Sequence, residues 1–142
     1  MILKQNMSSK SEFSLEHSFL CKSFIQYFNK YMTTSRLTLL TDMLKQDPDD
    51  TFVLFAVAKE YEKLDDTASA ILYYEKLKAV DSKYVGLYYH LGQILEKTDE
   101  IEKAQVIFKE GIAVATEIKD QHALSELKGV LMNLEIEYGL DD

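Results

Sequence analysis

Apolar residues between positions 51 and 118 follow the spacing of helices, and the pattern repeats after 34 positions. In the first half of each unit the apolar positions advance by three, one and three residues, which places them on one face of a helix. A similar stripe in the second half predicts a second helix. The aligned pairs are Leu54 with Tyr88, Val57 with Leu91, Ala58 with Gly92, Tyr61 with Leu95, Ala70 with Ala104, Tyr74 with Phe108, and Leu77 with Gly111. The pattern therefore predicts two helical hairpins, residues 51–84 and 85–118, which must stack to bury their apolar faces.

Small residues recur where the two helices of a hairpin are expected to approach each other. Ala58 and Gly92 share one such position in the first helix of each unit. Acidic and small polar residues lie between the predicted helices and supply turn and cap chemistry. In the second unit we expect Asp99 to cap the following helix and Glu102 to reach back toward it.

The pattern of packing residues in the second unit resembles the tetratricopeptide repeat, a family of helix-turn-helix units. The motif reads Tyr88-x-x-Leu91-Gly92-x-x-Leu95, followed by Ala104-x-x-x-Phe108. The sequence departs from the family pattern in lacking Trp, in having Leu95 where Tyr is usual, and in having Ser82 and Thr116 where Pro is frequent. The resemblance implies an all-α fold, a right-handed superhelical stack of antiparallel helix hairpins. It carries no chemistry, because the matching residues are packing residues.

Beyond Ile118 the repeat stops, but a further apolar stripe predicts a helix over residues 121–138. Its members are Leu124, Leu127, Val130, Leu131 and Leu134. A repeat array needs a terminal helix with a polar outer face, and we interpret this helix as that cap. With Tyr138 the stripe also suits a short coiled-coil seam, although two heptads are too few to favour it.

The chain before residue 51 is less regular. Ser35–Gln46 reads as the second helix of a partial repeat over residues 35–48, closed by Pro48. Residues 1–31 carry net charge +2, whereas the rest of the chain carries −10. This N-terminal segment is either a degenerate first helix, roughly His17–Lys30, or a separate and disordered piece; Met32 also allows translation to start there. We therefore divide the chain into residues 1–31 and a domain of residues 32–142.

Chemistry-bearing motifs are missing from the sequence. The three histidines lie far apart and lack a neighbouring metal-ligand partner, so we expect no metal site. Gly86 and Gly92 lie within a helix pattern rather than in a phosphate-binding loop, and we expect no cofactor. Net charge −8 disfavours nucleic acid. The single Cys21 excludes an internal disulfide, and no stretch has the length and apolarity of a signal peptide or a membrane span, so we expect a soluble, cytoplasmic protein.

Our interpretation is a non-catalytic adaptor that binds a peptide or a helix of another protein in a concave groove. Subtracting the core positions from the first helix of each unit leaves an adjacent strip that we expect to bind the partner: Phe52, Phe55, Lys59, Glu62, Tyr89, Gln93 and Glu96. Many members of the family capture C-terminal carboxylates with Lys and Asn, and these strips do not match that clamp. The alternatives are that the aromatic residues only pack against the preceding helix, or that the apolar faces mediate self-association as an assembly subunit.

Overall fold

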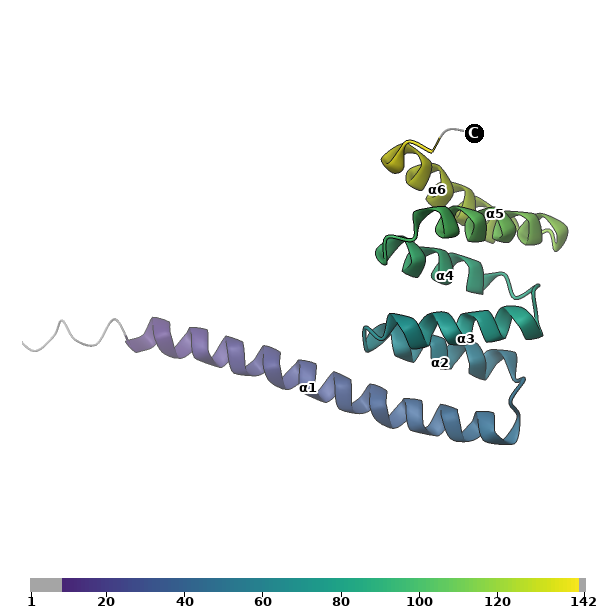
Figure 1. The fold of residues 1–142 in the computed structure, drawn as a ribbon. Coiled ribbons are helices and arrows are strands. Elements are labelled where there is room, and N and C mark those ends of the chain that lie inside the picture. The colour runs from purple at the N-terminus through teal and green to yellow at the C-terminus, as the bar shows by residue number, and fades with distance from the viewer. Residues whose placement is uncertain (1–8, 141–142) are drawn as a thin grey trace, which may run out of the picture.

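The computed structural model describes the backbone of residues 9–140 and the side chains of residues 20–140. This part of the chain is entirely helical and contains no strand (Figure 1). The helices are α1 (Ser9–Gln46), α2 (Thr51–Lys63), α3 (Thr67–Val80), α4 (Gly86–Lys97), α5 (Ile101–Glu117) and α6 (Gln121–Tyr138).

The helices stack in chain order, so that each packs mainly on its neighbours in sequence. Helices α2 and α3 form one hairpin, α4 and α5 form the next, and α6 covers α5 while also touching α4 (Figure 1). The C-terminal half of α1 packs on α2, and its N-terminal half extends away from the stack. The predicted all-α stack of helical hairpins is confirmed.

The reciprocal fit of α4 and α5 sets the register of the second hairpin. Gly92 of α4 lies against the ring of Phe108, and Gly111 of α5 lies against Tyr88. All four residues are buried. Since neither glycine carries a Cβ, the two helices approach closely enough for each aromatic side chain to fill the space above the opposite glycine.

Three interhelical turns in the described part of the chain share one backbone conformation, a residue with positive φ directly before the N-cap of the next helix. Asp65, Asp99 and Lys119 each adopt a left-handed conformation, with φ of 56°, 64° and 61°. The next residue is the N-cap of the following helix. Asp66 accepts a hydrogen bond from Ser69 N at 3.1 Å, and Asp120 accepts one from Ala123 N at 3.0 Å.

The prediction that Asp99 caps α5 is wrong. Asp99 reverses the chain, and Glu100 takes the N-cap position without a side-chain hydrogen bond to the backbone. The carboxylate of Glu100 pairs with Lys103 instead. Glutamate is one methylene longer than aspartate, so its carboxylate lies less favourably for the short ring that an N-cap closes. With Glu100 as the N-cap, Glu102 is the second residue of α5 and not the third, so it does not have the position from which the predicted contact back to the cap is made.

The predicted break before Ser35 is also wrong, because α1 runs unbroken from Ser9 to Gln46. The hydroxyls of this region bond back to carbonyls of the same helix: Thr34 Oγ1 donates to Lys30 O at 2.9 Å, and Thr38 Oγ1 donates to Thr34 O at 3.1 Å. Side chains satisfied in this way do not cap a new helix. With no Gly or Pro between Ser9 and Gln46, nothing in the sequence interrupts the backbone.

The C-terminal half of α1 joins the stack through a small apolar cluster and one buried ion pair. Leu40 packs with Val53 and Val57 of α2. Beside them lies the carboxylate of Glu60, which is only 2% exposed. Its Oε1 forms ion pairs with Arg36 Nε at 3.3 Å and with Lys63 Nζ at 2.8 Å. Arg36 therefore links α1 to α2, and a buried carboxylate of this kind needs such partners.

Candidate protein-interaction surface

Phe55 of α2 lies at the junction between the two repeats. Its ring centroid is 5.1 Å from that of Tyr84, 5.8 Å from that of Tyr74 and 5.5 Å from that of His90. Phe55 remains partly exposed, whereas Tyr74 is completely buried. Phe55 thus packs onto aromatic residues of its own repeat and onto His90 of the second, and its exposed edge contributes an apolar wall.

His90 of α4 brings together residues of both predicted strips. Lys59 Nζ lies 3.2 Å from His90 Nδ1, and Glu62 Oε1 lies 3.7 Å from the same nitrogen. The ring of Tyr89 meets that of His90 edge to face, with centroids 5.4 Å apart. Together with Phe55, these contacts make His90 the centre of a cluster that we call the His90 cluster: Phe55, Lys59, Glu62, Tyr89 and His90.

Glu62 is fully engaged within this cluster. One of its oxygens accepts a hydrogen bond from Lys59 Nζ at 2.8 Å, and the other accepts one from the buried hydroxyl of Tyr74. Burial of the phenol and its hydrogen bond to Glu62 raise the pKa of Tyr74. The carboxylate is thereby fixed between two helices of the first repeat and faces the second.

The environment of His90 favours its neutral form. Burial lowers the pKa of the imidazole below 6.5, and the positive charge of Lys59 lowers it further, while Glu62 and Glu126 act in the opposite direction. A neutral ring with an unprotonated Nδ1 accepts a hydrogen bond from the Lys59 ammonium.

A cleft of about 180 Å³ lies beside the His90 cluster, and Glu62, His90 and Gln93 form part of its wall together with Ala70 and Ile94. Small-molecule pockets usually exceed about 300 Å³. The cleft therefore suits a single side chain of a larger partner, with an apolar floor and polar groups at the rim.

The other predicted residues differ in how they relate to the cluster. Gln93 is exposed and donates a hydrogen bond to Tyr89 Oη at 3.1 Å. Glu96 is partly exposed near the C-terminal end of α4 and does not line the cleft. Phe52 is 70% exposed, and its ring takes part in none of the aromatic contacts of the His90 cluster. Five of the seven predicted residues thus lie in or beside one surface formed by α2 and α4, whereas Glu96 lies further along α4 and Phe52 lies at the exposed start of α2.

His90 is not among the binding residues that the sequence predicted. One signal was present: His90 aligns with Ala56 across the 34-residue period, so a polar ring replaces a small apolar residue. The contact with Glu62 depends on how the two repeats stack, which the period alone does not fix.

Among residues 20–140, no group of three or more His, Cys, Asp or Glu side chains is placed to hold a metal ion. In the described part of the chain, no helix combines the length and apolarity needed to cross a membrane.

The fold and this surface define an α-helical repeat protein, and comparison with known proteins identifies the repeat. A scan against protein families matches the tetratricopeptide repeat at residues 53–84 and 85–117. The solution structure of a tetratricopeptide repeat domain protein from Salinibacter ruber is 36% identical, with a TM-score of 0.63, over 68% of this chain and 97% of that one. The chain belongs to the tetratricopeptide repeat family. The search of curated proteins gave no match.

Two more distant structures share the fold and contain bound peptides. The TPR2B domain of yeast Sti1, in complex with pHsp70, has a TM-score of 0.69 at 19% identity, over 78% of this chain and 89% of that one. The type III secretion chaperone SycD of Yersinia enterocolitica, in complex with a peptide of the translocator YopD, has a TM-score of 0.69 at 13% identity, over 88% and 95%. At these identities the likeness shows the fold alone.

Proposed function

We propose that this protein is a non-catalytic adaptor that binds a peptide or a helix of another protein against the His90 cluster and its cleft. The observation that carries the proposal is the convergence of side chains from two repeats on His90, beside a cleft with the volume of a side chain. Apolar walls with satisfied polar groups at the rim are the usual composition of a peptide-binding surface. A cytoplasmic location is part of this proposal.

The peptide complexes of Sti1 and SycD support the proposal by analogy of fold. The surface itself indicates the chemistry of the ligand. Lys59 is already paired with Glu62, and Lys97 with Asp65 at 2.9 Å, so neither ammonium is placed as an open receptor for a carboxylate. The proposed ligand is therefore a segment with one apolar anchor for the cleft. Basic flanking residues are favoured because residues 32–142 carry a large negative charge.

Gln93 offers a direct test, because it is exposed, lines the cleft and makes its side-chain hydrogen bond only within α4. A library of random peptides displayed on phage is selected on the wild-type protein, and the enriched peptides are synthesised and titrated by calorimetry. Gln93→Arg should obstruct the cleft and weaken binding of these peptides at least about tenfold, which corresponds to about 1.4 kcal/mol.

Thr116→Arg is the matched control. Thr116 is exposed on α5, does not line the cleft, and gains the same charge when replaced by arginine. Its peptide affinity and the melting temperatures of both variants should equal those of the wild type. If Gln93→Arg and Thr116→Arg bind the selected peptides equally well, the cleft is not the binding surface.

A further inference from the structure

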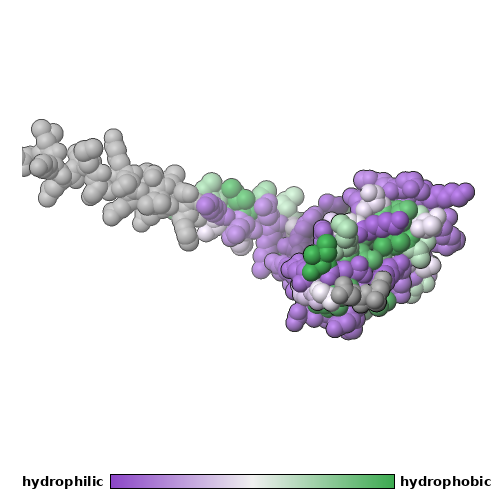
Figure 2. All heavy atoms as spheres, turned by 90° about the horizontal axis from the view of Figure 1, so that it is seen from above, coloured by the Kyte–Doolittle hydropathy of each residue, from purple (hydrophilic) through white to green (hydrophobic). Residues whose placement is uncertain are grey.

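The N-terminal half of α1 exposes an unusual number of large apolar side chains. Figure 2 shows hydrophobic residues gathered on this helix where it projects beyond the body of the molecule. Their exposed fractions range from 51% to 73%, and the residues are Leu20, Phe24, Ile25, Tyr27, Phe28, Tyr31 and Met32. Contiguous apolar surface of this size usually marks an interface.

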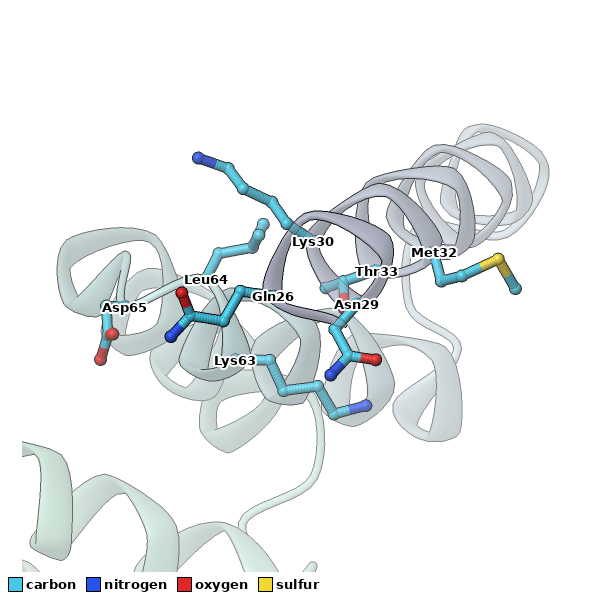
Figure 3. Close-up of a pocket in the computed structure, with 8 residues that line it drawn as sticks. All are labelled: Gln26, Asn29, Lys30, Met32, Thr33, Lys63, Leu64 and Asp65. Carbon is cyan, nitrogen blue, oxygen red and sulfur yellow. The ribbon is translucent and has the colours of Figure 1, made fainter. Parts of the chain in front are cut away.

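The side of α1 that faces its own stack is polar in this region. A recess of about 650 Å³ separates α1 from the end of α2, and Gln26, Asn29 and Thr33 form its α1 wall (Figure 3). Across the recess lie Lys63, Leu64 and Asp65, and Met32 lies at the α1 edge with its side chain pointing away from them (Figure 3). Apart from Met32, the exposed apolar residues of α1 do not line this recess, so most of the apolar face is directed away from the domain.

Part of this apolar face continues as a straight seam onto the C-terminal half of α1. Ile25, Phe28, Met32, Leu39 and Met43 follow one another at steps of three, four, seven and four residues, which keeps them on one side of a helix. Leu39 is 63% exposed and Met43 is 44% exposed, because α2 packs on the adjoining side of α1, against Leu40. The seam thus passes the point where α1 joins the stack without being covered.

We propose that two copies of this protein pair through α1, with the two helices antiparallel and the seam between them. In the register centred between Thr33 and Thr34, Phe28 of one copy lies beside the partner's Leu39, and Cys21 lies beside the partner's Gln46. This contact is independent of the His90 cluster.

The area and the charges favour a second copy in this orientation. The five seam residues with Phe24 and Tyr31 at its edge bury roughly 100 Å² each, hence about 1,400 Å² over both copies, which lies within the range of stable interfaces. Residues 1–31 are net basic, whereas residues 42–50, the last turn of α1 and the loop after it, carry net charge −3, with Asp42, Asp47, Asp49 and Asp50 against Lys45. Antiparallel pairing brings the basic half of each helix alongside the acidic end of the other, whereas parallel pairing brings like charges together.

The full-length protein should have the mass of a dimer by size exclusion with light scattering at micromolar concentration. Leu39→Glu places two charges in the seam and should weaken dimerisation at least tenfold, without loss of helical content, because Leu39 is exposed within its own chain. Val106→Glu, at a 53% exposed position of α5, is the matched control and should remain dimeric. A wild-type monomer at these concentrations, or equal dimerisation of both variants, would overturn the proposal.

A cysteine pair tests the orientation. Cys21 and Gln46 are both exposed and lie about 37 Å apart along one continuous helix, so they cannot bridge within a straight α1. Under mild oxidation Gln46→Cys should give a covalent dimer joined through Cys21 and the new cysteine, as peptide mapping would show. A Cys21–Cys21 bridge in the wild type would indicate parallel helices and overturn the register. A bridge within one monomeric chain would show that α1 folds back on its own domain, which also overturns the proposal.

Discussion

Gly92 of α4 lies so close to Phe108 of α5 that a Cβ on the glycine would stand 2.2 Å from Cε1 of the ring. The relationship is mirrored one turn away, where a Cβ on Gly111 would stand 2.5 Å from Cβ of Tyr88. Each helix thus contributes one glycine and one aromatic residue to the same contact. The packing of α4 on α5 in the second hairpin depends on these two contacts between a glycine and an aromatic ring.

Gly92→Ala should therefore destabilise the protein although alanine is the better helix former. The added methyl group meets a ring that is completely buried and cannot move aside, and overpacking of this kind costs about 1–3 kcal/mol. Gly129→Ala is the control, because a Cβ there meets nothing within 4 Å. It should raise stability by about 0.5–1 kcal/mol. Chemical denaturation measures both, and a Gly92→Ala variant as stable as the wild type would contradict the described packing.

Lys119→Gly should stabilise the protein. Lys119 adopts φ of 61° in the turn before α6, a conformation that costs an L-residue about 1–2 kcal/mol, partly offset by the greater unfolded-state freedom of glycine. The expected net gain is about 0.5–1 kcal/mol. The same substitution at the exposed helical position Lys128 should instead cost about 1 kcal/mol. Thermal unfolding of the two variants should move in opposite directions; a shared loss of stability would argue against strain at Lys119.

The protein should lose stability as the solution becomes more acidic, and His90 should contribute to this loss. Its pKa in the folded state lies below 6.5, first because of burial and then because of Lys59, despite the opposing charges of Glu62 and Glu126. The unfolded chain therefore binds this proton more readily, and the folded state loses stability as the pH falls from about 6.5 toward the folded-state pKa. Above pH 6.5 this contribution is complete.

His90→Gln separates this effect from that of the acidic residues. Melting temperatures are measured for both proteins between pH 5 and 7.5. The wild type should lose more stability than the variant over the acidic part of that range. A difference between the two that does not change with pH would exclude a depressed pKa for His90.

The sequence predicted the helices of the two repeats because their packing residues carry the pattern. Gly92, Phe108 and Ala104 occupy the contact that defines the family, so the 34-residue period placed α2 to α5 and the apolar stripe placed α6. The turn before α5 was less predictable, because Asp99 has the side chain of an N-cap residue, and only the left-handed backbone conformation of Asp99 moves the N-cap position to Glu100.

The sequence was a poorer guide to α1 and to the His90 cluster. The run Thr33-Thr34-Ser35 resembles the cap of a helix that starts at Ser35, yet the hydroxyl of Thr34 donates to Lys30 O within a continuous helix, and local composition does not distinguish the two cases. The strip from Phe55 to Glu62 was proposed from spacing alone. The contacts of Lys59 and Glu62 with His90 depend on how the two repeats stack on each other, which is a property of the tertiary structure.

The most direct test of the binding surface is an NMR titration of the isotope-labelled protein with a peptide selected from the random library. We expect the largest chemical-shift changes at Tyr89, His90 and Gln93, around the cleft, with little change at Glu102 and Thr116 on α5. Saturable changes centred on α5 or on the exposed face of α1, with the resonances of His90 and Gln93 unmoved, would contradict a binding surface at the His90 cluster.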